Sequence, residues 1–346
     1  MKLGIMVGSM PGTIADRVAL VQEAESLGFD SAWTSEAWGR DAVTHASWLL
    51  AHTHAIKVGT GIMQMSARTP AMAAMTAMSL QEMSGGRFLL GIGPSGPQVI
   101  EGWHGEPFGK PLARSREYIA IVRKILAREE PLRHQGEHYQ IPNTGPGTTG
   151  LGKALKTILH PDPNLKIYTG AFTPAGIRTA AEHADGTLPI FMNPQRFEIF
   201  ADDLNQGFAK AGGGKTLEDF DLAPFCRVVI NSDVNRARDA LRDYYALYVG
   251  GMGARGKNFY NTYVRSLGYE AMAQKVQDLY LDGHKREAAA HIEGAFIDEV
   301  ALLGPPARIR DRLQIWTEAG KAGKVGTLVV FAPNVDSIRL LAETVL

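Results

Sequence analysis

The sequence contains a single cysteine, Cys226, in 346 residues. One cysteine cannot form a disulfide framework within the chain, which excludes the small secreted proteins that depend on such bonds. An excess of charge is also missing, because 36 Lys and Arg residues balance 36 Asp and Glu residues. This balance argues against nucleic acid or an anionic membrane as the main partner.

Long hydrophobic runs are absent as well. No apolar stretch of the chain approaches the roughly 18 residues of a membrane span. The apolar run in the N-terminal MKLGIMVGSMPG is too short for the core of a secretory signal, and Pro11 and Gly12 interrupt it. We therefore expect a cytoplasmic protein with a small-molecule substrate and no membrane partner.

What the chain does have is a regular alternation of short apolar runs with amphipathic stretches, the pattern of repeated βα units. It predicts eight strands, at Leu3–Val7, Ser31–Thr34, Lys57–Met63, Arg87–Ile92, Lys166–Thr169, Thr187–Phe191, Phe225–Ile230 and Thr327–Phe331. A helix is expected after each of them. Eight such units predict an α/β fold of the (β/α)8 TIM-barrel type rather than a doubly wound sheet of six strands.

One irregularity precedes the eighth strand, where an extra helical segment covers about residues 250–293. No charge-rich linker divides the chain. Residues 1–346 are therefore predicted to form one barrel domain with a helical insertion.

A glycine motif, LLGIGPSGPQ, begins within the fourth predicted strand. Gly91, Gly93 and Gly96 have the G-x-G-x-x-G spacing of a Rossmann dinucleotide site. That site normally lies in the first βαβ unit, followed about 20 residues later by an acidic residue at a strand end. Here three βα units come first, and Pro94 and Pro97 remove two of the N–H donors that would bind a pyrophosphate. In a barrel the turn would instead lie at the C-terminal mouth, where active sites are found. Its glycines could contribute to such a site, or they could only permit a tight turn.

Two other strand ends carry candidate site residues. Glu36 follows the second strand beside Trp38, and a carboxylate among aromatic residues at a barrel mouth could act as an acid or base, or simply be solvated. Gly61 lies in the third strand, where glycine often marks a bulge or the close approach of a ligand. Ile62, Met63 and Met65 could underlie a flat ring or belong to the barrel core.

Anion sites have three candidates. Gly170, Ala171 and Thr173 follow the fifth strand and precede a helix whose N-terminus is suited to a phosphate. The segment 231-NSD-233 competes, because barrel phosphate sites usually follow the seventh and eighth strands. The basic loop around Arg255 could be solvated or could hold an anionic cofactor tail.

Two other kinds of site lack their signatures. His52-x-His54 has no third ligand nearby, so no metal site is predicted. No serine lies in a G-x-S-x-G elbow, the usual local sign of a hydrolase triad.

Four segments together make the sequence resemble the luciferase-like flavin monooxygenase superfamily. The resemblance is narrower to its actinobacterial branch that uses the deazaflavin coenzyme F420, which includes methylenetetrahydromethanopterin reductase-like proteins. The segments are GTGIMQMSARTP, RFLLGIGPSGPQVIEGWHG with PLARSREYI, YTGAFTPAGIRTAAEHADGTLP and MGARGKNFYN. The resemblance implies a TIM-like barrel that holds a flavin or deazaflavin at its C-terminal mouth, and it implies a homodimer.

The resemblance also implies which residues bind the cofactor. It places a non-proline cis peptide at Gly61–Ile62, behind the central ring. It assigns contacts with the ring or its side chain to the turn after the fourth strand, and contacts with the phosphate to the turn after the fifth. These residues are Gly93, Pro94, Ser95, Gly96 and Gln98 in the first turn, and Gly170, Ala171 and Thr173 in the second.

For catalysis, the resemblance assigns Glu36 as the family's acidic residue after the second strand. Several relatives have a histidine directly after this acid, where the present chain has Ala37. Chemistry that needs that histidine, such as sugar-phosphate oxidation, is therefore not expected. His45 and His104 are possible substitutes whose positions the sequence does not reveal.

The sequence thus predicts an F420-dependent oxidoreductase that moves a hydride between deazaflavin C5 and an organic substrate. The cofactor carries the chemistry, while the protein binds, orients and excludes water. Two alternatives remain open: an FMN-dependent luciferase-like monooxygenase, and a cofactor-binding relative without turnover. The substrate is not identified, and residues 144–153 and 250–293 are expected to shape its pocket.

Overall fold

A computed structural model describes all residues, 1–346, and contains a closed barrel of parallel strands. Six neighbouring strands follow one another around it: β1 (Lys2–Met6), β2 (Ser31–Thr34), β3 (Lys57–Thr60), β5 (Phe88–Gly93), β8 (Ile167–Thr169) and β9 (Gly186–Thr187). The seventh position is shared by β10 (Asp221–Leu222) and β11 (Phe225–Ile230), which are separated by two residues. β10 pairs with β9, and β11 pairs with β13 (Thr327–Phe331), which returns to β1. The predicted barrel is confirmed.

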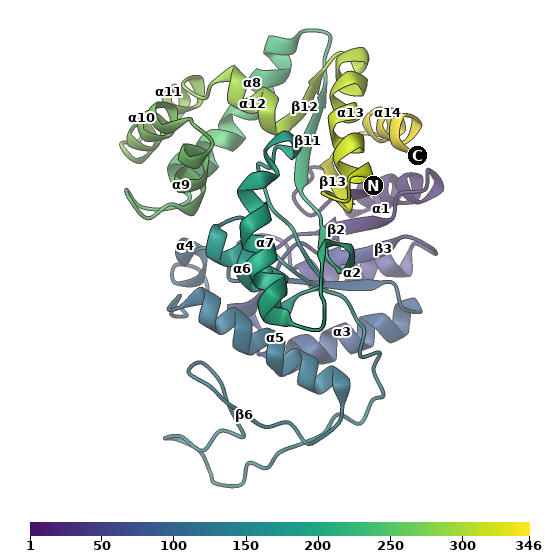
Figure 1. Cartoon of the computed structure of the whole chain (residues 1–346), viewed down its shortest axis with the longest axis vertical. Coiled ribbons are helices and arrows are strands. Elements are labelled where there is room, and N and C mark those ends of the chain that lie inside the picture. The colour runs from purple at the N-terminus through teal and green to yellow at the C-terminus, as the bar shows by residue number, and fades with distance from the viewer.

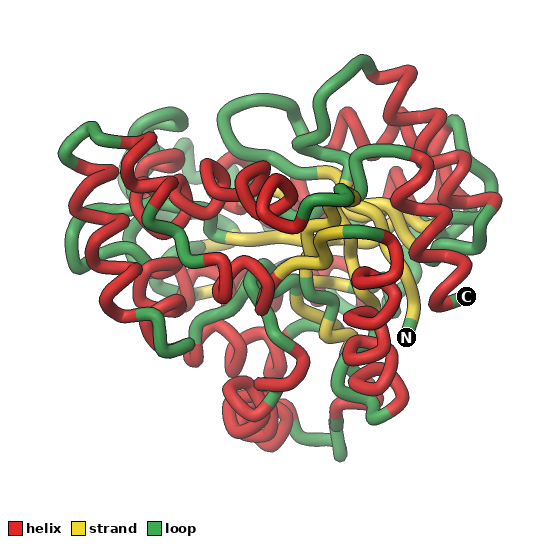
Figure 2. The backbone as a smooth tube through the Cα atoms, turned by 90° about the horizontal axis from the view of Figure 1, so that it is seen from above, coloured by secondary structure: helices red, strands yellow, loops and turns green.

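Helices surround the strands, as Figure 2 shows from above. They are α1 (Ile14–Ser26), α2 (Ala42–Ala51), α3 (Pro70–Ser84), α5 (Pro111–Ala127), α6 (Pro174–His183), α7 (Glu198–Ala211), α8 (Val234–Ala246), α13 (Pro306–Lys321) and α14 (Val335–Val345). Their ends follow local sequence signals. For example, Thr69 caps α3 ahead of Pro70, and Gly85 ends it with a left-handed φ of 64°. None of these helices is both long and apolar enough to cross a bilayer.

The predicted helical insertion is present. A π-helical turn (Leu247–Gly251) extends α8, and the helices α9 (Phe259–Ser266), α10 (Glu270–Leu281), α11 (Lys285–Ala290) and α12 (Gly294–Val300) follow. In Figure 1, α9, α10 and α11 lie together to one side of the upper barrel. The insertion ends in β12 (Ala301–Gly304), which pairs in parallel with β11. The sequence analysis missed β12 because four apolar residues directly after a helix resemble its continuation. That residues 1–346 form one domain stays a prediction.

Shorter elements refine the predicted ones. The third strand is interrupted at Gly61–Ile62, whose peptide bond is cis as the resemblance implied, and it resumes as β4 (Met63–Gln64) beside β5. The sixth strand ends earlier than predicted, although Ile190 still bridges to the seventh strand. A small hairpin joins β6 (His134–Gln135) to β7 (Gln140–Ile141), and one helical turn, α4 (Pro97–Ile100), follows the glycine motif.

The barrel interior is filled by its own layer of side chains, distinct from the larger core between strands and helices. That layer consists of Met6, Trp33, Leu89, Tyr168, Leu188, Ala223 and Val329. Trp33 is fully buried and meets Tyr168 edge-on, with ring centroids 5.1 Å apart. This packed layer closes the barrel from below, so that ligands can enter only above it.

Candidate active site at the barrel mouth

Three predicted cofactor segments meet at Ile62. A Cβ built on Gly93 would lie 3.0 Å from the Ile62 side chain, and one built on Gly170 would lie 3.1 Å from it. A Cβ on Gly61 would lie 3.1 Å from both Met6 and Phe225, in the centre of the barrel. The strand ends β3, β5 and β8 therefore converge on one partly exposed isoleucine. Glycine is needed at these positions because any side chain would press on Ile62 or on the interior layer.

Gly91, the first glycine of the motif, has a structural role. A Cβ there would lie 1.7 Å from the backbone oxygen of Thr60. Thr60 in turn bonds Gly91 twice: its hydroxyl donates to Gly91 O at 2.7 Å and accepts from Gly91 N at 3.1 Å. The close approach of β3 and β5 thus explains this glycine, and a Rossmann site does not.

The two turns above Ile62 differ in character. After β5, Ser95 has a left-handed φ of 59°, Pro94 and Gly96 are partly exposed, and Gln98 points to solvent at the start of α4. After β8, Thr173 caps α6 and accepts a hydrogen bond from Gly176 N at 3.2 Å. The second turn offers a capped helix N-terminus, whose positive dipole end suits an anion.

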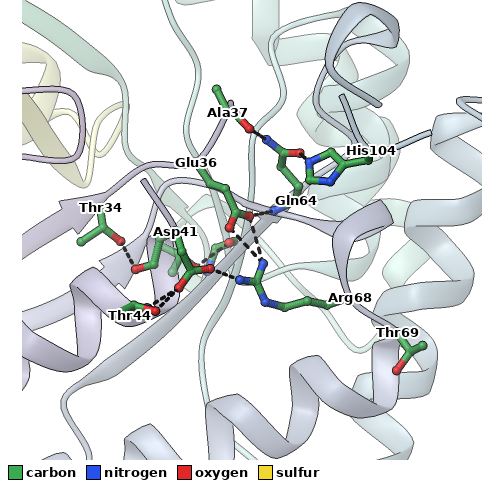
Figure 3. Close-up of polar contacts among 12 residues, drawn as sticks. Thr34, Glu36, Ala37, Asp41, Thr44, Gln64, Arg68, Thr69 and His104 are labelled. Carbon is green, nitrogen blue, oxygen red and sulfur yellow. Dashed lines mark hydrogen bonds and ion pairs between the residues drawn. The ribbon is translucent and has the colours of Figure 1, made fainter. Parts of the chain in front are cut away.

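Glu36 lies in an ion-pair network at the end of β2 (Figure 3). Its two carboxylate oxygens lie 3.1 and 3.0 Å from Arg68 Nη1, and one of them also accepts from Gln64 N at 2.8 Å. The side chain of Glu36 is only 9% exposed. Arg68 reaches Asp41 as well. Burial raises the pKa of Asp41, but hydrogen bonds from Thr44 and the charge of Arg68 outweigh burial and leave the pKa below its usual value.

Gln64 connects this network to a histidine. Its amide donates to Ala37 O at 2.9 Å, and its Oε1 lies 2.7 Å from His104 Nε2. Because the amide oxygen can only accept, His104 donates through Nε2. His104 is thus joined to Ala37 through one side chain.

His45, the other possible substitute, is buried instead. Its Nε2 accepts from Arg17 Nε at 3.3 Å, and its Nδ1 is buried without a partner. Arg17 also donates to the backbone of Met10 and Gly12, so the pair holds the loop after β1. Burial, together with the charges of Arg17 and Arg40, lowers the pKa of His45 to about 4.

This lowered pKa predicts a pH-dependent stability. Between pH 6.5 and about pH 4, His45 is protonated in the unfolded chain and neutral in the folded chain. The free energy of unfolding should therefore rise as the pH rises through this window. The contribution of His45, on the order of 2 kcal/mol, should be fully present above pH 6.5. Urea unfolding at several pH values should show a shallower rise for His45→Asn. His160→Asn, at an exposed histidine, is the control, and an unchanged slope in His45→Asn would contradict the prediction.

The remaining sequence candidates have structural roles. Asp233 of the NSD segment caps α8, accepting from Asn235 N at 2.8 Å. Arg255 pairs with Asp278 and Asp282 of the insertion, which favours the solvated-loop interpretation. Met63 and Met65 are buried in the core. No group of three or more His, Cys, Asp or Glu side chains is arranged to hold a metal ion.

Sequence reasoning missed Arg68 and Gln64. Both lie in the segment GTGIMQMSARTP, in which the sequence predicts roles only for Gly61, Ile62, Met63 and Met65. A signal was present, because Gln64 is a polar residue in an apolar strand and buried polar side chains require partners. The partners come from the loop after β2 and from the loop after α4, and sequence spacing does not show that these loops lie together.

Comparison with known proteins agrees with this geometry. The family model of the luciferase-like monooxygenases matches residues 1–322. A Mycobacterium tuberculosis protein named "Putative coenzyme F420-dependent oxidoreductase" is 43% identical over 347 residues, covering 100% of this chain and 99% of the relative. The structure of the coenzyme F420 dependent tetrahydromethanopterin reductase from Methanopyrus kandleri superposes with a TM-score of 0.78 at 23% identity, covering 99% and 98% of the two chains.

A third similarity is to an FMN protein. The oxygenating constituent of the 3,6-diketocamphane monooxygenase of Pseudomonas putida, in complex with FMN, superposes with a TM-score of 0.67 at 19% identity, covering 100% of this chain and 97% of that one. At such identities the structural matches support the barrel fold. The family match over nearly the whole length and the relative at 43% identity carry the assignment: this chain belongs to the luciferase-like monooxygenase family, and within it resembles the F420-dependent oxidoreductases.

Proposed function

We propose that this protein is an F420-dependent oxidoreductase that transfers a hydride between deazaflavin C5 and an organic substrate at the barrel mouth. The observation that carries the proposal is the meeting of Gly61, Gly93 and Gly170 around Ile62, where side chains would fill the space above the interior layer. The relative at 43% identity supports F420 as the cofactor.

The residues around Ile62 fit a flat ring with an anionic tail. Gly61 and Ile62 would lie behind the ring, and the turn of Gly93, Pro94, Ser95, Gly96 and Gln98 would contact the ring or its side chain. The turn of Gly170, Ala171 and Thr173 would hold the phosphate at the N-terminus of α6. Glycine at position 170 suits this role, because a bulky residue there would press on Ile62, behind the proposed ring.

When bound, the deazaflavin supplies or accepts the hydride at C5. The catalytic role of Glu36 stays a prediction, and its hydrogen bonds constrain that role. Because both carboxylate oxygens already accept from Arg68, Glu36 holds Arg68 and the backbone of Gln64 in place. His104, which donates to Gln64, is a second group at this site able to move a proton.

Titration of the purified protein with F420 and with FMN tests the cofactor. We expect F420 to bind the more tightly, as monitored by fluorescence or calorimetry. The FMN complex of a structurally similar monooxygenase makes FMN the second candidate, and tighter binding of FMN would replace the proposal with that monooxygenase. Tight F420 binding without substrate-linked redox change would instead favour a cofactor-binding relative without turnover.

Gly170→Val tests the phosphate turn. The added side chain would press on Ile62, so we expect F420 affinity to fall by on the order of 100-fold, the effect of misplacing several charge-assisted hydrogen bonds. Ala211→Val, at an exposed alanine at the end of α7, is the control. Unchanged affinity in Gly170→Val would show that the phosphate lies elsewhere.

We also propose a homodimer, formed through the outer face of α2 and α3. This face exposes apolar side chains, with Trp48 50% and Met75 56% exposed, beside a groove lined by Val43 and Leu80. Met75→Glu should yield monomers in sedimentation experiments, whereas Leu155→Glu, at an exposed leucine elsewhere, should not. A wild-type monomer would contradict the proposal. The cytoplasmic location stays a prediction.

A further inference from the structure

Arg227 is a charged residue inside the barrel wall. It lies on β11 between Cys226 and Val228, which face the outer core, so it shares the inner side with Phe225. Phe225 reaches the centre of the barrel, where its Cζ lies 3.1 Å from the Cβ position of Gly61. Arg227 pairs in register with Phe331, the last residue of β13. Its side chain therefore lies one layer above Phe225, at the mouth.

Aromatic rings hold the guanidinium of Arg227. Its Cζ lies 3.6 Å from the ring centroid of Tyr244 and 4.5 Å from that of Phe331. Its Nε is buried and has no hydrogen-bond partner. By contrast, two arginines of α8, Arg238 and Arg242, each pair with an aspartate. The rings stabilise the cation through their faces, but they leave the buried Nε–H of the guanidinium without an acceptor.

A row of aromatic rings extends from Tyr244 along the mouth to the proposed phosphate turn. Tyr244 neighbours Tyr248, Tyr248 neighbours Tyr260, and Tyr260 stacks on Phe172, with centroid distances of 4.7, 4.9 and 4.9 Å. We call these four residues the aromatic wall. Burial raises the pKa of the Tyr244 and Tyr248 hydroxyls, so they stay protonated and supply no negative charge to Arg227. The wall thus joins a cation without a counter-charge to the predicted cofactor turn.

We infer that Arg227 binds the carboxylate of the substrate, and that the substrate carries this carboxylate on a flat, conjugated carbon frame packed against the aromatic wall. The inference rests on the proposed function, because it places the substrate in the mouth that would hold the deazaflavin. An arginine with a purely structural role in this wall would be expected to have a carboxylate or backbone partner, since a partly buried charge without one is costly. A carboxylate supplies two in-plane acceptors that match the free edge of the guanidinium.

Calorimetric titration with cinnamate and with its neutral amide, cinnamamide, tests the inference. Both probes are flat and conjugated, and only the first is an anion. Because a hydrogen bond to a charged group is worth about tenfold or more in affinity, cinnamate should bind at least about tenfold more tightly than cinnamamide. Arg227→Met should abolish this preference, and Arg227→Lys should keep part of it. Arg255→Met, at the arginine paired with Asp278 and Asp282, should leave it unchanged.

Each titration is run on the apoprotein and on protein loaded with F420, after thermal unfolding has shown that the variants are folded. Equal affinity for the two probes, or a preference that survives Arg227→Met, would overturn the inference. So would a loss of F420 affinity in Arg227→Met with cinnamate binding unchanged, since Arg227 would then belong to the cofactor site. An Arg227-dependent preference in a protein that fails to bind F420 would support the anion site and reject the proposed cofactor.

Discussion

Replacing Gly91 with alanine is expected to lower the free energy of unfolding by about 3 kcal/mol or more, at the upper end of overpacking effects. The new Cβ would lie 1.7 Å from the backbone oxygen of Thr60, which has no flexible end that could move aside. Relief of the clash requires β3 and β5 to separate, which breaks both hydrogen bonds between Thr60 and Gly91. Chemical denaturation monitored by tryptophan fluorescence measures the loss, and an insoluble variant counts as the same outcome.

The third glycine of the same motif provides the control. A Cβ on Gly96 would meet nothing closer than Gln98 Oε1 at 3.6 Å, and the φ of Gly96 is −116°. Gly96→Ala should therefore leave stability nearly unchanged. If both variants lost a similar free energy of unfolding, the close approach of β3 and β5 at Gly91 would not explain the effect.

Arg68→Met is expected to cost about 3 kcal/mol, the range measured when one partner of a buried ion pair is removed. Arg68 pairs with both Glu36 and Asp41, and its loss leaves two neighbouring carboxylates, one of them only 9% exposed, without a cation. The segment that carries Gln64 should loosen at the same time, because Glu36 accepts from its backbone N–H. Urea unfolding gives the stability, and hydrogen exchange at Gln64 reports the loosening.

A double-mutant cycle separates the ion pair from general packing. Glu36→Gln combined with Arg68→Met should lose clearly less than the sum of the two single losses, because the second change removes an unpaired charge. Lys110→Met breaks the exposed pair with Glu137 and should have no measurable effect. Additive losses, or a loss in Arg68→Met as small as in Lys110→Met, would contradict the buried network.

The barrel was predictable from the sequence because its signals are local. The strands Ser31–Thr34, Phe225–Ile230 and Thr327–Phe331 have the predicted boundaries, since apolar runs bounded by polar or turn residues define them. The departures occur where a distant partner decides the structure. β12 is a strand because β11 has a free edge beside it, and the sixth strand ends early although its sequence remains apolar.

The candidate site was predictable in its glycines but not in its network. Gly93 stood out through the G-x-G-x-x-G spacing, and Gly170 through its place between a strand and the N-terminus of a helix. Both flank Ile62. The pairing of Glu36 with Arg68 joins residues 32 apart, and His104 meets Gln64 from 40 residues away. Such contacts depend on how loops cross the mouth. Arg227 was discoverable in principle as the one charge in the strand FCRVVI.

The attachment of β12 has a consequence for how this protein can change. The inserted helices leave the barrel through α8, which follows β11, and they return as β12, which pairs with β11 at four positions. Both ends of the inserted segment are thus attached to β11. Lengthening a segment whose two ends are held together costs little free energy. Tyr260 of the aromatic wall belongs to this segment, whereas Gly61 and Gly170 do not. Exchange of the insertion between relatives would therefore remodel the part of the mouth that carries Tyr260, while Gly61 and Gly170 would stay in place.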